Sequence, residues 1–304
     1  MNLPIVWHPD YIAPLRPGHS FPMSKYGYLR AALERRGLLR PGGYLAPAAL
    51  GPRQIAAAHD LRYVERVIAL TLSREETRRI GLPATEAVAR RACLSSAGTL
   101  LAARLAMEHG LAVNAAGGSH HAGPDYGAGY CVFNDVAVAA ATLLAEGTAR
   151  RILVIDCDVH QGDGTARIFD GDPRVFTVSL HAAKNFPARK AVSDLDVPLA
   201  DGTGDAAYLE ALETALDAAL ARFDADFAFY NAGVDPWEGD RLGRLALSLD
   251  GLRARDRRVL ERLRAAGLPT AAALGGGYSR DPEELAERHA ILFEEAAALA
   301  GAAG

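Results

Sequence analysis

Short apolar runs alternate with amphipathic stretches along most of this chain. From about residue 111 each apolar run is rich in Ala or β-branched residues, and a stretch with apolar residues at helical spacing follows it. This alternation is typical of a parallel β-sheet with helices on both faces. We predict strands at 111–115, 151–157, 174–180, 226–231 and 269–274, and helices at 24–36, 60–72, 84–109, 133–147, 205–222, 250–266 and 282–300.

The chain carries no sign of an internal boundary. It has 304 residues without a repeat, a low-complexity linker or a sharp change of composition. A chain of this length can bury a large core, and α/β folds often exceed about 200 residues without splitting. We therefore predict a single domain over 1–304, an α/β fold built on an open parallel β-sheet flanked by helices on both faces.

Composition narrows the class of protein. Hydrophobic residues make up 50% and charged residues 23%, which is ordinary for a globular enzyme. The net charge of −4 gives no reason to expect nucleic-acid binding. The densest basic stretch, 253–264, is interspersed with Asp256 and Glu261, as on a solvated helix face.

Cysteine use and the N-terminus bear on the compartment. Cys93, Cys131 and Cys157 are odd in number and lack C-x-x-C spacing, so they predict neither disulfides nor a thiolate zinc site. Residues 1–11 lack the apolar core of a secretory signal. No apolar run reaches the roughly 20 residues that span a bilayer. We predict a cytoplasmic protein without membrane insertion.

Two motifs suggest a metal site. On an extended segment Asp156, Asp158 and His160 share one face, and Asp235 follows the strand predicted at 226–231. Carboxylate and imidazole ligands suit zinc, or iron(II) under reducing conditions. Asp158, His160 and Asp235 would leave a coordination position open for water, as in catalytic rather than structural sites. Taken alone, D-x-H fits a strand-end cap and a buried histidine equally well.

A glycine-rich loop at 117–123 carries two adjacent histidines, His120 and His121. If each ring donates its Nδ1–H to a carboxylate, its Nε2 faces the metal-bound water for acid–base chemistry. Asp156 and Asp163 flank the metal motif and are the available carboxylates. The alternative is a surface pair in a flexible loop.

Tyr278 follows three glycines after the strand predicted at 269–274. Its phenol could stabilise a developing oxyanion, although a tyrosine packed on a turn explains the pattern equally well. Tyr130 could line a narrow channel, and capping of the helix that begins there is the expected role of Asn134 or Asp135. Cys131 and Cys157 are expected to be buried rather than nucleophilic. Polar residues thus follow several strand ends at one sheet edge, where open α/β sheets bind ligands.

These motifs resemble the zinc-dependent histone deacetylase family, within the arginase/deacetylase fold. They are G-G-S-H-H-A at 117–122, G-Y-C-V-F-N-D at 129–135, D-C-D-V-H-Q-G-D-G at 156–164, N-A-G-V-D-P at 231–236 and L-G-G-G-Y at 274–278. They occur in the family's order over nearly the whole chain. The segments 185–196 and 201–205 look like the class IV and bacterial branch.

The resemblance implies a role for each motif residue. Asp158, His160 and Asp235 would bind zinc. His120 and His121 would transfer protons, held by Asp156 and Asp163, and Tyr278 would polarise the amide carbonyl. An acyl-lysine tunnel is implied along Gly129, Tyr130, Phe186 and Gly276. A structural potassium is implied beside Asp156, Ser179 and Leu180.

Two positions depart from the family's pattern. Gln161 stands where many members have a second His, which would alter only the surroundings of the ligands. Ser20 stands where related chains often have an Arg near an internal channel, which puts product exit in question.

The function expected is hydrolysis of the amide of acyl-lysine, with acetyl or a longer acyl group, on a protein or peptide. One alternative is a small-molecule amidohydrolase such as an acetylpolyamine deacetylase, acting on a small acylated amine. A catalytically silent acyl-lysine binding module and an arginase-like binuclear manganese hydrolase are further alternatives, although the latter requires more carboxylates than the motifs supply. The sequence leaves open the acyl-chain length, the metal in vivo and the oligomeric state.

Overall fold

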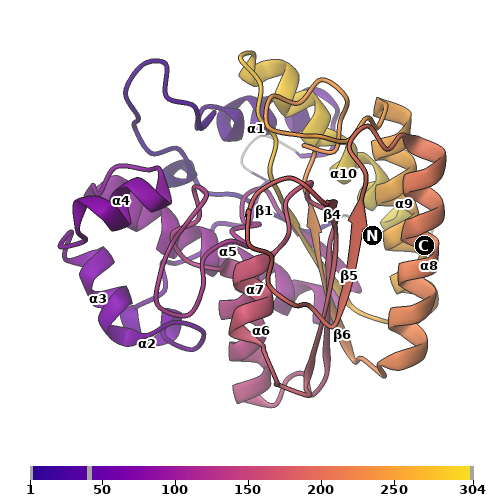
Figure 1. Cartoon of the computed structure of the whole chain (residues 1–304), viewed down its shortest axis with the longest axis horizontal. Coiled ribbons are helices and arrows are strands. Elements are labelled where there is room, and N and C mark those ends of the chain that lie inside the picture. Colours follow the sequence, from indigo (N-terminus) through magenta and orange to yellow (C-terminus); the bar gives the residue numbers. More distant parts are fainter. Residues whose placement is uncertain (1–2, 40–42, 302–304) are drawn as a thin grey trace.

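One β-sheet forms the centre of the molecule (Figure 1). The computed structural model describes residues 3–39 and 43–301. The sheet has seven strands, all parallel, in the order β1-β2-β7-β6-β3-β4-β5. In chain order they are β1 (Ile5–Val6), β2 (Leu111–Asn114), β3 (Ile152–Asp156), β4 (Val175–Ala182), β5 (Leu195–Leu199), β6 (Phe227–Ala232) and β7 (Thr270–Leu274).

Helices cover both faces of this sheet. On one face α8, α9 and α10 pack side by side, and α1 packs on α10; α5 and α6 cover the other face (Figure 1). The helices are α1 (Lys25–Arg35), α2 (Pro52–Ile55), α3 (Leu61–Ile68), α4 (Arg74–Ile80), α5 (Glu86–His109), α6 (Asp135–Glu146), α7 (Asp163–Ile168), α8 (Asp205–Arg222), α9 (Leu249–Ala265) and α10 (Pro282–Gly301), with a 3-10 turn at Pro9–Tyr11. The predicted α/β fold with an open parallel sheet is confirmed.

The core is divided between the two faces of the sheet. In β3, Leu153 and Ile155 pack into the larger cluster, whereas Ile152 and Val154 pack into the cluster beneath α5 and α6. All residues of β3, β4, β6 and β7 are buried. Strands buried on both sides read as continuous apolar runs. This is why the central strands were predictable to within a residue or two at each end.

The sequence reading missed the two edge strands. β1 has only two residues and pairs with β2 through Ile5 and Val113. β5 lies at the opposite edge, is mostly half-buried and contains Pro198. Proline is tolerated on an edge strand because it has no N–H to donate to a further neighbour. Neither strand therefore has the apolar run that marked the others.

One helix prediction was too long. The helix predicted at 60–72 is α3, which ends at Ile68, and Leu70 adopts a positive φ of 58°. The following helix, α4, begins after Ser73, whose side chain accepts the Glu76 N–H while Glu76 accepts the Ser73 N–H. This capping box starts a separate helix.

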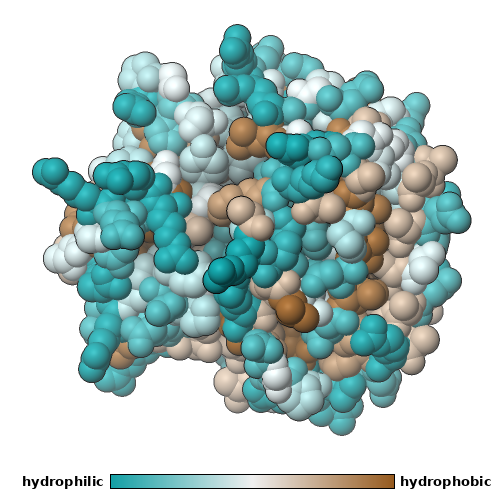
Figure 2. Space-filling model, in the orientation of Figure 1, coloured by the Kyte–Doolittle hydropathy of each residue, from teal (hydrophilic) through white to brown (hydrophobic). Residues whose placement is uncertain are grey.

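The molecular surface is mostly hydrophilic on the face shown in Figure 2, with hydrophobic residues in separate patches. Within residues 3–39 and 43–301 no helix combines the length and hydropathy needed to cross a bilayer.

Candidate active site

The site lies where the strand order reverses. From β3 the chain continues outward to β4 and β5, whereas β6 and β7 pair on the other side of β3. Asp158 and His160 follow β3, and Asp235 follows its neighbour β6. Parallel strands with this switch leave a crevice beyond their carboxyl ends. The fold thus brings the three residues together from segments some 75 positions apart.

These three side chains form a compact buried group. Asp158, His160 and Asp235 offer ligand atoms that all lie within 4.8 Å of one another. Nδ1 of His160 lies 2.9 Å from Oδ1 of Asp158 and 3.2 Å from Oδ2 of Asp235. The other oxygen of Asp235 accepts the Val159 N–H at 2.9 Å, which fixes the carboxylate against the β3 segment.

The electrostatics of this group suit a cation. Burial opposes protonation of His160, but the two carboxylates outweigh burial and raise its pKa to about 10. Burial and the Asp158 charge raise the pKa of Asp235 to about 7. Oδ2 of Asp235 is buried and accepts no hydrogen bond. Any side chain at Gly276 would collide with both carboxylates, so glycine is required there. Two crowded acids with an unsatisfied oxygen fit a divalent metal.

The two loop histidines lie beside this group, each bound to its own carboxylate. His120 Nδ1 lies 2.6 Å from Asp156 Oδ2, and His121 Nδ1 lies 2.7 Å from Asp163 Oδ1. The two Nε2 atoms are 3.1 Å apart. Asn231 donates to Asp156 at 2.9 Å and so orients that carboxylate toward His120. The predicted pairing of rings and carboxylates is therefore the arrangement in the structure.

The two rings differ in their affinity for protons. Burial disfavours the charged form of both. For His120 the Asp156 and Asp158 carboxylates outweigh burial and raise the pKa to about 9. For His121 burial and the positive charge of His120 outweigh Asp163 and lower the pKa to about 3. One protonated and one neutral ring satisfy the short Nε2 contact, because one nitrogen then donates and the other accepts.

Asp135 holds the histidine loop from behind. It was one of two candidate caps of α6, but Asn134 caps this helix, by accepting the Ala137 N–H at 3.0 Å. The Asp135 carboxylate accepts the Ser119 N–H at 2.7 Å, the Gly118 N–H at 3.2 Å and the Thr99 hydroxyl at 2.5 Å. Gly118 has a φ of +69° beneath Leu274 and Asn231, where a side chain would clash. Of the two candidate caps, Asn134 is the one that caps the helix, because the Asp135 side chain is taken by these tertiary contacts.

Tyr278 completes the polar group. It is only 8% exposed, and its ring centroid lies 6.3 Å from that of His160 and 5.8 Å from that of Tyr130. Its N–H donates to Asp240 at 2.7 Å, which fixes the end of the glycine loop. Burial, followed by the charges of Asp158 and Asp235, holds the phenol pKa well above its usual value. Tyr278 is therefore a neutral hydroxyl donor.

Aromatic rings line the entrance. Phe186, 44% exposed, stands edge-on to His121 with ring centroids 4.7 Å apart. Gly129 has a φ of +53°, and a Cβ there would press on His121 and Phe186. Tyr130, with a φ of 66°, lines the same cavity as His121, Gly276 and Tyr278. Of the four predicted tunnel residues, Gly129, Tyr130 and Gly276 line the cavity, and Phe186 packs on His121 beside it.

The comparisons with known proteins agree with this geometry. The pattern that defines the histone deacetylase domain matches residues 19–294. The chain belongs to the histone deacetylase family. An uncharacterized protein from Picosynechococcus sp. is 45% identical over 97% of this chain and 99% of its own length. Histone deacetylase 2 of Arabidopsis thaliana is 35% identical over 60% of this chain, a match that spans 48% of the plant protein.

Two solved structures share the histone deacetylase fold with this chain. The HDA15 HD domain superposes with a TM-score of 0.80 at 21% identity, covering 96% of this chain and 90% of that one. An acetylpolyamine aminohydrolase from Burkholderia pseudomallei superposes with a TM-score of 0.76 at 24% identity, covering 98% and 99% of the two chains.

The two departures from the histone deacetylase pattern are structurally distinct. Gln161 is buried and bonds to both backbone groups of Ala191 and, at 2.8 Å, to Asp196, so it holds the 190–196 segment. Ser20 is exposed, with Oγ 2.7 Å from the hydroxyl of Tyr130, which lines the cavity. The interior wall of the cavity carries Lys25 and Arg91.

Sequence reasoning missed several buried polar residues around this histone deacetylase site. Arg255, 0% exposed, donates to the carbonyls of Gly233 and Cys157, the latter at 3.2 Å, and pairs with Asp256 at 2.8 Å. Cys157 directly precedes Asp158, and Gly233 lies two residues before Asp235. Lys25 lies 3.2 Å from His289 Nε2, beneath the Gly275–Gly277 loop. Neither residue belongs to a compact motif, so only the fold reveals them.

His59 links the loop after the histidine pair to the start of α6. Its Nε2 accepts the Asn134 N–H at 2.8 Å, so its Nδ1 carries the proton and donates to Gly123 O at 2.9 Å. The neutral ring satisfies both contacts. Burial accordingly lowers the pKa of His59 to about 4. Cys131 and Cys157 are buried, as predicted.

Proposed function

We propose that this protein is a metal-dependent deacylase that hydrolyses the amide of an acyl-lysine side chain. The observation that carries the proposal is the convergence of a three-ligand metal group, two histidine–carboxylate pairs and a buried tyrosine at one sheet edge. We assign zinc as the metal, with iron(II) as its substitute under reducing conditions, held by Asp158, His160 and Asp235.

The bound metal would supply Lewis acidity toward the acyl carbonyl and lower the pKa of a coordinated water. The chain's own residues do the rest. The His120–His121 pair takes a proton from the attacking water and returns one to the departing lysine amine. Asp156 and Asp163 keep the Nδ1 protons in place, so that only the two Nε2 atoms exchange protons with the reactants. Because the rings are in contact, their titration belongs to the pair.

Tyr278 donates its hydroxyl hydrogen to the oxyanion that develops on the acyl carbonyl. Its raised pKa keeps that hydrogen in place at neutral pH. Gly129, Tyr130, Phe186 and Gly276 flank the lysine side chain as it approaches. The aromatic rings of Tyr130 and Phe186 suit the apolar four-carbon stem of lysine.

Further assignments complete the proposal. A structural potassium fits beside Asp156 and Ser179, which are register partners on β3 and β4 and offer oxygen ligands, with Leu180 adjacent. We propose that 1–304 acts as one catalytic domain in the cytoplasm. A silent binding module has no use for paired proton-transfer groups, so the intact His–Asp pairs favour an enzyme.

The test is a panel of substrates on one sample of known metal content. Acetyl-lysine peptide, a fatty-acyl-lysine peptide and acetylpolyamine are compared by kcat/KM, with the metal measured in the same preparation. We expect hydrolysis of an acyl-lysine peptide that disappears with a chelator and returns with zinc. Preference for acetylpolyamine would favour a small-molecule amidohydrolase. Absence of hydrolysis by fully metal-loaded protein would overturn the proposal.

A further inference from the structure

An open groove lies beside the entrance to the site. It has a volume of about 620 Å³ and runs between the 12–24 segment and the residues that follow Tyr278. Three arginines line it, Arg16, Arg241 and Arg280, and all three are exposed. It is much larger than the cavity of about 30 Å³ at the buried polar group. A macromolecular segment can therefore lie in the groove without entering the catalytic cavity.

The groove is structurally continuous with the site. The Arg241 N–H donates to the Tyr278 carbonyl at 3.2 Å, and Arg280 is two residues beyond Tyr278. On the other side, His19 packs edge-on against Tyr130 with ring centroids 6.3 Å apart. A chain whose acyl-lysine reaches between Tyr130 and Tyr278 therefore has its flanking residues over this groove.

In the part of the chain that the structure describes, the three groove arginines form no ion pair. Among residues 3–39 and 43–301, no carboxylate lies within 4.0 Å of their guanidinium nitrogens. Elsewhere in the molecule, most ion pairs are formed by arginine. The acids next to Arg241 and Arg280 in sequence accept backbone N–H groups instead. Asp240 accepts the N–H groups of Tyr278, Leu242 and Gly243. Asp281 accepts those of Glu283 and Glu284 at the start of α10.

Among the described residues, the groove lining contains three arginines and no carboxylate, although the net charge of the chain is −4. Unpaired guanidinium groups that line a groove attract carboxylates and disfavour cations at the same place. Since the arginines are exposed, their contribution is to recognition and to the association rate rather than to a buried ion pair.

We propose that the groove selects acyl-lysines that are flanked by aspartate or glutamate in a peptide or protein segment. This rests on the proposed function, because it assigns the substrate class of the same site. Arg16, Arg241 and Arg280 bind the flanking carboxylates, and the acylated lysine enters between Tyr130 and Tyr278. The cationic chain of a polyamine is repelled by the same groups.

The experiment compares three acetyl-lysine peptides of equal length, whose flanking residues are acidic, neutral or basic. The expected order of kcat/KM is acidic, then neutral, then basic. Raising the salt from about 0.05 M to about 0.5 M should bring the three values together, because the Debye length falls well below 10 Å. Equal values at low salt, or a preference for the basic peptide, would overturn the proposal.

The variants Arg16→Gln, Arg241→Gln and Arg280→Gln localise the effect. Each should reduce the ratio of kcat/KM for acidic over neutral peptide about two- to fivefold, and the triple variant should bring it close to one. Arg53→Gln is the matched control, since Arg53 is exposed on α2 and does not line the groove. A triple variant that keeps the wild-type ratio would place the selectivity elsewhere.

Direct binding separates this proposal from the proposed function. Fluorescence anisotropy of the labelled acidic peptide reports the groove whether or not the peptide is hydrolysed. Arginine-dependent binding without turnover would uphold the groove and overturn the deacylase. Turnover of acyl-lysine peptides without any dependence on flanking charge would do the reverse.

Discussion

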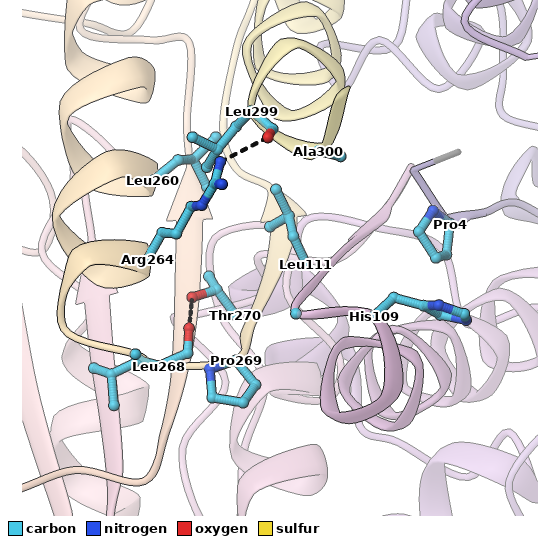
Figure 3. Close-up of a pocket in the computed structure, with 12 residues that line it drawn as sticks. Pro4, His109, Leu111, Leu260, Arg264, Leu268, Pro269, Thr270, Leu299 and Ala300 are labelled. Carbon is cyan, nitrogen blue, oxygen red and sulfur yellow. Dashed lines mark hydrogen bonds between the residues drawn. The ribbon is translucent and has the colours of Figure 1, made fainter. Parts of the chain in front are cut away.

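A pocket lies beyond the amino ends of the strands and another beyond their carboxyl ends, and the two pockets differ in chemistry. Beyond the amino ends of β2 and β7 lies a pocket of about 290 Å³, lined mainly by Leu111, Leu260, Leu268 and Pro269 (Figure 3). Two of its polar side chains bond to its own walls: Arg264 donates to Leu299 O and Thr270 to Leu268 O, both shown by dashed lines. Beyond the carboxyl ends the cavity is about ten times smaller and crowded with buried titratable groups.

This contrast shows that the size of a cavity does not indicate where chemistry can occur. The smaller cavity is the one in which polar groups from several strand ends come together. A parallel sheet points every strand the same way, so the loops at the carboxyl ends bring their polar residues together there, whereas the pocket at the amino ends of β2 and β7 is lined largely by apolar residues. The following changes probe the contrast, beginning at the metal group and ending at the amino edge.

Removal of a ligand should have the largest effect. We expect Asp235→Ala to lose the metal and to lower kcat/KM about a thousandfold or more. The reason is that a bound metal stabilises the charge that develops in the transition state by several kcal/mol. Metal content by emission spectrometry and peptide turnover, measured on the same sample, test this. A variant that keeps stoichiometric zinc would remove Asp235 from the ligand set.

Loss of the tyrosine hydroxyl should be next. Tyr278→Phe should retain the metal and lower kcat about 100- to 1000-fold, the range for losing one oxyanion donor. Because the hydroxyl acts on charge that develops during the reaction, KM should change much less than kcat. Near-wild-type turnover would exclude the oxyanion role.

The buried Arg255 should affect metal affinity without touching the reactants. Arg255→Met removes the donor to the Cys157 and Gly233 carbonyls and leaves Asp256 unpaired. We expect metal affinity to fall about 10- to 100-fold and the free energy of unfolding to fall by about 3 to 5 kcal/mol.

The double variant Arg255→Met/Asp256→Asn is the control for that change. It removes the unpaired charge, so stability should recover in part while metal affinity stays low. Recovery of both together would reduce Arg255 to a purely structural role.

His59, near the carboxyl ends of the strands, should make the free energy of unfolding sensitive to acid. Its pKa is about 4 in the folded chain and 6.5 in the unfolded chain. Above pH 6.5 both states are neutral, but between pH 6.5 and 4 only the unfolded state takes up the proton. Stability from this residue should therefore fall by up to about 3 kcal/mol over that window. Urea unfolding of metal-free wild type and His59→Gln at several pH values measures the difference in slope.

The smallest effect on activity should be at the amino edge. Leu260→Ala enlarges the pocket of Figure 3 and should lower the free energy of unfolding by about 2 kcal/mol, the low end for such a truncation beside an existing cavity. At temperatures well below unfolding, kcat/KM should equal that of wild type. A clear loss of turnover would show that the two edges are coupled.

What the sequence could predict follows from how local each signal is. The central strands and long helices depend on apolar runs and periodicity, which are readable in one stretch. The histidines and acids of the site lie in compact motifs, and their strand-end positions followed from the alternation itself. By contrast, β5 is an edge strand with a proline, and Asp135 acts on a loop 16 residues away from it rather than on its own helix.

The surroundings of Ser20 could not be predicted from the sequence for the same reason. The sequence around Ser20 indicated that it lies near the site. The exposure of its side chain, however, depends on how the 12–24 segment lies against Tyr130. Lys25, His59 and Arg255 were missed because each is recognised only by partners that are far away in sequence.

The anchoring of the histidine loop by Asp135 and Thr99 has a consequence for how such proteins diversify. These two residues come from α6 and α5, on the side of the loop away from solvent, whereas the groove arginines come from surface segments. The histidine loop is thus held by residues that do not line the groove. If the groove selects the substrate as proposed, substitutions of its arginines can change which flanking residues are favoured while the histidine pair keeps its position.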